Sequence, residues 1–280
     1  GSRNKTLSFP LKTDKYTFFK LEITELIDNK QKPQLAELSI DASTELPYSD
    51  YTRTLDIDNA IHTVMYKENG ITFKREYFMS YPDNVMVMRL TSDSKKGKLS
   101  RIISLESLHT DKTITADGHT ITMTGYPTPV SGDKRVGDAW KNGLIYAQQL
   151  VVKNKGGKIS VVDGTKLKVE DADEIIVLMS AATNYVQCMD DSYNYFSQED
   201  PLEKVQATLH KVADKKYTAL LATHQKDYHS LYDRMRLNLG NLPEAPVAPT
   251  DSLLKGMDEN TNSEQENQYL EMLYFQFGRY

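Results

Sequence analysis

The stretch Asp173–Val186, which reads DEIIVLMSAATNYV, decides the fold of this chain. It contains the longest apolar run of the sequence, residues 175–179 (IIVLM), followed by small residues and by the polar, aromatic end Thr183-Asn184-Tyr185. An apolar run this short and rich in β-branched side chains is too short for a core helix, and it fits a strand buried on both faces. The stretch therefore predicts a central strand, and the chain changes from a β pattern to a helical pattern soon after it.

The residues before this stretch form short alternating segments that are separated by turn sequences. The segments are residues 51–58, 61–66, 71–79, 85–90, 99–105, 120–124, 144–152, 159–162 and 167–169. Asn69-Gly70 is a strong hairpin signal, because a type I′ turn needs positive φ at both central positions. Short strands at a spacing of roughly ten residues are typical of a large β-sandwich. We therefore predict a mainly β fold, a large antiparallel β-sandwich, over residues 47–199.

The first 46 residues carry a separate β pattern. Residues 16–27 and 34–41 alternate apolar and polar side chains around a turn-like connection, which predicts two edge strands. This pattern resembles the last strands of discoidin-type, galactose-binding-like domains, and two ordinary antiparallel strands explain it equally well. Residues 1–46 are therefore interpreted as edge strands or as a discoidin-like remnant.

A helical pattern begins at Asp200. Asp200-Pro201-Leu202-Glu203 combines an N-cap acid, a first-turn proline and a glutamate three residues after the cap. Two apolar stripes follow, one of Leu202, Val205, Leu209 and Val212, the other of Tyr217, Leu220, Leu221, His224, Tyr228 and Leu231. Residues 234–240 return to a period of two and predict a returning strand. We therefore interpret residues 200–241 as a helical linker with a returning strand.

The C-terminal residues combine a linker and a helix. Residues 242–249 (LPEAPVAP) contain three prolines and read as an interdomain linker. A last helical stripe follows, formed by Tyr269, Leu270, Leu273 and Phe277. Residues 242–280 are therefore predicted to be a Pro-rich linker and the first helix of a further, truncated domain.

Composition and charge exclude several classes of partner. The net charge of −5 and the absence of basic clusters argue against nucleic acid or an anionic membrane surface. No apolar run reaches the roughly 18 residues of a membrane span. The single Cys188 cannot form an intramolecular disulfide, and no cysteine–histidine spacing fits zinc. We predict no metal, no cofactor, no nucleic acid and no membrane partner.

Five segments in one order carry a resemblance to a known family. They are residues 51–90 (YTRTLDIDNAIHTVMYKENGITFKREYFMSYPDNVMVMRL), 173–186, 224–240 (HQKDYHSLYDRMRLNLG), 249–254 (PTDSLL) and 270–280 (LEMLYFQFGRY). They resemble the N-terminal domain and linker of glycoside hydrolase family 95, the α-L-fucosidase type. The resemblance implies a β-super-sandwich, a helical linker and then an (α/α)6 barrel. In that family the barrel carboxylates hydrolyse a terminal α-L-fucoside with inversion.

The resemblance also implies what this chain lacks and what it works with. The family's catalytic carboxylates and its water-positioning asparagines have no counterpart in the sequence, so we predict no catalytic residue and an inactive chain. The implied parent is a bacterial glycoside hydrolase, periplasmic or secreted, that degrades glycans. Its barrel, in the same polypeptide, is the expected partner of this chain and of both apolar helix stripes. The alternative is a stand-alone carbohydrate-binding β-sandwich module, which has no use for the C-terminal helix.

The acidic pairs of the chain are interpreted as solvated. Inverting hydrolysis needs two carboxyl groups about 6.5–9.5 Å apart. Asp56 and Asp58 belong to an exposed segment and Asp190-Asp191 to a polar one, so we expect surface carboxylates in both places. His224, on an apolar stripe, is expected to be a hydrogen-bonded interface residue.

One loop is a candidate for carbohydrate contact. Residues 125–142 form a long segment with the only tryptophan, Trp140, and with Tyr126 near its start. A long loop in a compact domain is often functional, and sugars stack their C–H faces on aromatic rings. Tyr126 and Trp140 are therefore predicted to contact carbohydrate. The competing interpretation, which we favour, is that Trp140 covers the edge of the core.

Overall fold

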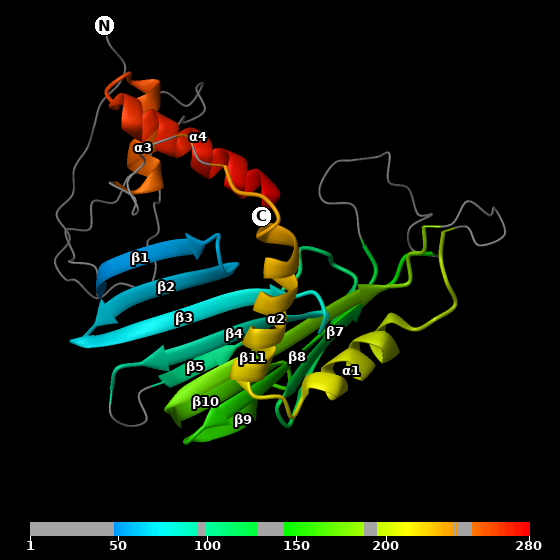
Figure 1. Ribbon diagram of the computed structural model, residues 1–280. Helices are drawn as coiled ribbons and strands as arrows, with labels where there is room; N and C mark the ends of the chain where they lie inside the picture. Colours follow the sequence, from blue (N-terminus) through cyan, green and yellow to red (C-terminus); the bar gives the residue numbers. More distant parts are fainter. Residues whose placement is uncertain (1–47, 95–98, 128–142, 188–194, 238, 240–247) are drawn as a thin grey trace, which may run out of the picture. The chain divides into compact units, whose positions relative to one another are not determined.

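The computed structural model describes residues 48–94, 99–127, 143–187, 195–237, 239 and 248–280 (Figure 1). Nearly all of them belong to the compact unit that begins at Ser49. The segments 16–27 and 34–41, which the sequence predicts as edge strands, lie outside the described residues, so that prediction stays a prediction.

Most of the described residues before α1 form one large sheet. Its strand order is β1-β2-β3-β4-β11-β8-β7-β6. The strands are β1 (Tyr48–Asp56), β2 (Ile61–Glu68), β3 (Ile71–Ser80), β4 (Val85–Ser92), β6 (Lys112–Asp117), β7 (Thr120–Gly125), β8 (Tyr146–Lys155) and β11 (Glu174–Thr183). A smaller sheet has the order β5-β10-β9, with β5 at Leu99–Ile103, β9 at Lys158–Val162 and β10 at Lys166–Ala172. The two sheets confirm the predicted antiparallel sandwich.

Strand β11 is the centre of the large sheet. It pairs with β4 on one side and with β8 on the other, both antiparallel. Ile175 and Val177 belong to the core between the two sheets, and Leu178 belongs to a second core on the opposite face. All three are at most 2% exposed. Because side chains alternate along a strand, the apolar run supplies both cores, which confirms burial on both faces.

The hairpin predicted from Asn69-Gly70 joins β2 to β3. Their φ angles are +51° and +77°, the positive values that a type I′ turn requires. The register places Glu68 opposite Ile71, so the two residues between them form the whole loop. The sequence therefore fixes this register locally.

Two helices cover the second face of the large sheet (Figure 1). They are α1 (Pro201–Val212) and α2 (Tyr217–Tyr232). The Asp200 carboxylate caps α1 by accepting a hydrogen bond from the Leu202 N–H at 2.8 Å. Both apolar stripes pack against sheet residues such as Phe78 and Leu178, with Val205 and Leu220 at their centres.

The expectation that the barrel covers these stripes is therefore wrong. The second face of the large sheet is itself apolar, because β3, β4, β8 and β11 each place buried side chains on it. The apolar face of the sheet and the apolar stripes of the helices therefore bury each other from water. Leu231, assigned to the α2 stripe from the sequence, is 57% exposed, and Tyr232 is buried instead.

Two more helices follow, α3 (Thr250–Asp258) and α4 (Glu264–Arg279), and α3 packs on α4. A capping box fixes the start of α4, since the Ser263 hydroxyl accepts from the Glu266 N–H and the Glu266 carboxylate accepts from the Ser263 N–H. The predicted last helix is present and begins earlier than its apolar stripe. Helix α3 was not predicted, because the prolines before it read as a linker.

The predicted returning strand is absent from residues 234–237 and 239. The guanidinium of Arg279 donates to the backbone oxygens of Met235 at 2.6 Å and Tyr232 at 2.5 Å. These carbonyl groups therefore bond a side chain instead of a neighbouring strand. Residues 234–237 and 239 therefore follow α2 without forming a strand, although their side chains alternate with a period of two.

Candidate functional site

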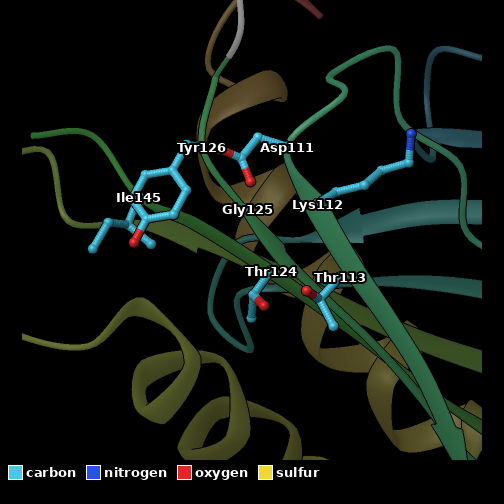
Figure 2. A pocket seen from close by; sticks show the side chains of 7 residues that line it. All are labelled: Asp111, Lys112, Thr113, Thr124, Gly125, Tyr126 and Ile145. Carbon is cyan, nitrogen blue, oxygen red and sulfur yellow. The ribbon is translucent and has the colours of Figure 1, made fainter. Parts of the chain in front are cut away.

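The candidate site is a hollow of about 150 Å³ at one end of the large sheet, where β6 begins and β7 ends beside the start of β8 (Figure 2). Its lining residues come from these strands and from the residues that flank them. They are Asp111, Lys112, Thr113, Thr124, Gly125, Tyr126 and Ile145.

The β6–β7 hairpin brings the two sides of the hollow together. Its register runs from Asp117 opposite Thr120 to Lys112 opposite Gly125, and the Tyr126 N–H continues it by donating to the Asp111 carbonyl at 3.0 Å. Strand β6 was not predicted from the sequence. The signal was present, because Asp-Gly between alternating segments is typical of a hairpin, and Gly118 has φ of +54°.

Gly125 allows a close approach of three strands. A Cβ atom here would collide with the Asp111 carbonyl and with the Tyr146 hydroxyl. The Tyr146 ring in turn lies 5.6 Å from that of His109, centroid to centroid, and its hydroxyl lies 3.4 Å from Ser107 Oγ. Glycine at this position therefore lets the starts of β6 and β8 pack against the end of β7.

The ammonium group of Lys112 is hydrogen-bonded to the loop that precedes β6. It donates to the backbone oxygens of Ser107 at 2.7 Å and His109 at 2.9 Å. Figure 2 shows the Lys112 side chain extending away from the other lining side chains. The functional groups of the hollow are therefore the Asp111 carboxylate, two threonine hydroxyls and the Tyr126 phenol, with Ile145 as its apolar wall.

This arrangement can hydrogen-bond hydroxyl groups, but it is poorly suited to acid–base catalysis. Asp111 is the one carboxylate among the lining residues, whereas inverting glycoside hydrolysis needs a pair about 6.5–9.5 Å apart. The hollow is also smaller than ligand pockets, which measure roughly 300–1,000 Å³. A hollow of this size can contact only part of a ligand.

The structure places one of the two predicted carbohydrate contacts. Tyr126 lines the hollow, whereas Trp140 lies outside the described residues. Of the acidic pairs, Asp190-Asp191 also lies outside them. Asp56 is exposed and accepts hydrogen bonds from the Asn59 N–H at 3.1 Å and side-chain amide at 2.8 Å, which makes it a turn residue.

His224 is an interface residue, as predicted. It is 6% exposed, its ring stacks on Phe78 at 4.9 Å, and its Nε2 lies 3.1 Å from the Ala60 carbonyl oxygen. One turn of helix further on, the Tyr228 hydroxyl donates to the Ile57 carbonyl at 2.6 Å. Helix α2 thus binds the backbone of the turn between β1 and β2. Sequence reasoning could not identify this partner, because it lies more than 160 residues away.

Four carboxyl groups of the described residues have a pKa shifted from the ordinary value, and none of these four is raised. Hydrogen bonds to the carboxylate lower the pKa of Asp93, Asp163, Glu170 and Glu266. A general acid for glycoside hydrolysis needs a pKa raised above the ordinary value. The same part of the chain contains no cluster of three metal-ligating side chains, and none of its helices has the length and apolar character to cross a membrane.

Two family models match the chain in succession. Residues 16–188 match "Glycosyl hydrolase family 65, N-terminal domain", and residues 216–280 match "Glycosyl hydrolase family 95 catalytic domain". The first match spans the described sandwich, and the second spans α2, α3 and α4.

Three curated relatives carry fucosidase names. "Probable alpha-fucosidase A" of Aspergillus niger is 29% identical over 251 residues, which cover 88% of this chain and 30% of that protein. "Alpha-L-fucosidase 2" of Arabidopsis thaliana is 31% identical over 247 residues, covering 83% and 28%. "Probable alpha-fucosidase A" of Aspergillus oryzae is 25% identical over 265 residues, covering 88% and 33%. The chain thus spans about a third of the length of these relatives. By the first family match it belongs to the glycosyl hydrolase family 65 N-terminal domain family, and it is similar to the N-terminal region of family 95-like α-fucosidases.

Proposed function

We propose that this chain supplies the non-catalytic β-sandwich and helical linker of an inverting α-L-fucosidase that removes terminal fucose from glycans. The succession of the two family matches carries this proposal, because a sandwich-domain match is followed within one chain by a catalytic-domain match. The fucosidase names of the relatives support the substrate class. The same succession favours this function over a stand-alone carbohydrate-binding module.

The role of the described residues is support rather than acid–base chemistry. The hollow at the end of the large sheet has one lining carboxylate, and hydrogen bonds lower the pKa of Asp93, Asp163, Glu170 and Glu266. Hydrolysis with inversion needs one carboxyl group kept protonated and another that activates water. We therefore assign both groups to the (α/α)6 barrel of the same polypeptide.

Helices α3 and α4 provide the surface that we assign to the barrel. Their exposed large apolar side chains are Leu254, Met257, Tyr274 and Phe277, with Tyr274 80% exposed. Methionine and aromatic side chains are common at the core of protein interfaces.

A joined protein tests this function. The chain is fused to the catalytic domain of a curated α-fucosidase relative, and turnover of 4-nitrophenyl α-L-fucoside is measured. Replacing Tyr274 and Phe277 with Ser is expected to lower the activity of the fusion at least severalfold or to lower its Tm by several degrees. Tyr81→Ser, at an 86% exposed site on the β3–β4 turn, is the matched control. An unchanged Tyr274/Phe277 variant would contradict the docking role. Nuclear magnetic resonance of the first product decides the stereochemistry, since inversion releases β-L-fucose.

A further inference from the structure

A pair of exposed tyrosines lies where the chain leaves β11. Tyr185 and Tyr195 are 53% and 49% exposed, the planes of their rings differ by 11°, and the ring centroids lie 6.5 Å apart. We propose that these two residues, the tyrosine platform, bind a pyranose ring of a glycan by stacking against its C–H face. The inference rests on the proposed function only for its choice of sugar.

A buried asparagine holds the platform in place. Asn184 is 4% exposed, and its side-chain oxygen accepts from the Ile145 N–H at 2.8 Å while its side-chain nitrogen donates to the Gly143 carbonyl at 2.7 Å. Its backbone N–H donates to the Ile145 carbonyl, and its carbonyl accepts from the Ser197 N–H. A buried amide that is hydrogen-bonded through both its oxygen and its nitrogen fixes the local backbone strongly. The backbone that carries Tyr185 is therefore held in place by its neighbour Asn184.

The second tyrosine is held by backbone pairing. Tyr185 forms a β-bridge with Phe196, and the Val186 N–H donates to the Tyr195 carbonyl at 2.9 Å. Tyr195 itself has φ of +63°, a left-handed conformation that is unfavourable for an aromatic L-residue. Such strain persists where surrounding contacts enforce it, and it is concentrated at functional sites. The left-handed backbone of Tyr195 therefore supports a functional role for this exposed residue.

Packing under the pair leaves little freedom. A Cβ atom at Gly143 would collide with the ring of Phe196, so the segment before β8 lies directly against the bridge. The same segment contains Ile145, which is bonded to Asn184 on one side and lines the Tyr126 hollow on the other. The platform and the hollow therefore share one supporting segment.

The composition of the pair favours a sugar over a protein surface. Among the residues that the structure describes at this corner, the large exposed apolar side chains are both tyrosines, whereas α3 exposes Leu254 and Met257 and α4 exposes Tyr274 and Phe277. A tyrosine offers a rigid apolar face and a hydroxyl at its edge, at a low cost in side-chain entropy. A pyranose presents the complementary pattern, with C–H groups on a face and hydroxyls around the rim. Two nearly parallel rings suit such a flat ligand.

Saturation-transfer nuclear magnetic resonance with the full chain tests the proposal. The probes are 2′-fucosyllactose and lactose, which separate stacking of any pyranose from a preference for fucose. We expect saturation on the C–H protons of one sugar face. Tyr185→Ala and Tyr195→Ala should each weaken binding about tenfold, a loss typical of an aromatic stacking partner. Tyr185→Phe keeps the ring and should bind within about threefold of the original chain, because stacking needs the face of the ring. Tyr81→Ala, a change of an exposed tyrosine elsewhere, should have no effect.

Several results would overturn the proposal. One is the absence of saturation transfer from both glycans, and another is unchanged binding in both alanine variants. Loss of binding in Tyr126→Ala alone would move the sugar site to the hollow. Normal sugar binding by the alanine variants together with lower activity of the fused enzyme would make the pair a protein-docking surface. The proposed function fails separately, when the fused enzyme turns over no fucoside while the platform still binds.

Discussion

Leu178→Ala is the substitution that tests the double burial of β11 most sharply. Leu178 is 1% exposed and belongs to the core between the large sheet and helices α1 and α2. Its neighbours Val177 and Met179 point to the other core. The substitution therefore removes side-chain volume from the helix-covered face and leaves the core between the sheets intact.

The expected cost follows from the atoms removed. Leucine loses the equivalent of three buried carbon groups, and at roughly 0.8 kcal/mol each this gives about 2.4 kcal/mol of lost transfer free energy. The cavity left behind raises the cost, since buried leucine-to-alanine changes span about 2–5 kcal/mol. We expect the free energy of unfolding to fall by about 3 kcal/mol, which corresponds to roughly 6–12 °C in Tm for a unit of this size.

Urea unfolding followed by circular dichroism measures this cost. The matched control is Leu231→Ala on α2, because Leu231 is 57% exposed and should change the free energy of unfolding by less than about 0.5 kcal/mol. Equal costs for the two substitutions, or a cost below about 1 kcal/mol for Leu178→Ala, would refute the double burial of β11.

Three further predictions concern buried or paired polar groups. Burial raises the pKa of Tyr217 to about 12 from 10.0, and its hydroxyl has no hydrogen-bond partner among the described residues. Because the pKa of Tyr217 is higher in the folded than in the unfolded protein, the free energy of unfolding should fall as the pH rises from about 10 towards 12. In urea unfolding, Tyr217→Phe should show a smaller fall over this pH range and no loss of stability at pH 7. Lys215 Nζ lies 2.6 Å from the Oδ1 atom of the buried Asp83, so Lys215→Met should lower the free energy of unfolding by about 1–3 kcal/mol, and a value near zero would contradict a structural ion pair. Arg279→Lys cannot reproduce the fork to two carbonyl groups, so hydrogen exchange at the end of α4 should become faster while that of β11 stays unchanged; equal rates in both variants would show that the fork does not hold α4.

The elements that could be predicted are those whose signal is local. The apolar run of β11, the Asn69-Gly70 turn and the Asp200 cap each specify their structure within a few residues. The partner of the helix stripes could not be predicted this way. Apolar stripes show that a helix needs cover, but the cover is the second face of the large sheet, which forms only when distant strands pair.

The candidate site was less predictable than the fold. Tyr126 could be singled out because it is aromatic and lies in a long loop. Asp111 reaches the same hollow through the β6–β7 hairpin, whose Asp-Gly signal was overlooked, and Ile145 reaches it through the pairing of β8 with β7, which no local pattern reports. The role of Asn184 depends on backbone groups about 40 residues earlier. Long-range pairing thus decides the site.

The central claim is that this chain supports catalysis without performing it. Its most direct test is turnover of 4-nitrophenyl α-L-fucoside by the purified 280-residue chain. We predict no release of nitrophenol above the rate in buffer, because the hollow at the end of the large sheet has one lining carboxylate, whereas inverting hydrolysis needs a pair. Turnover by this chain that disappears when Asp111 is changed to Asn would contradict the claim and place the chemistry at the end of the large sheet.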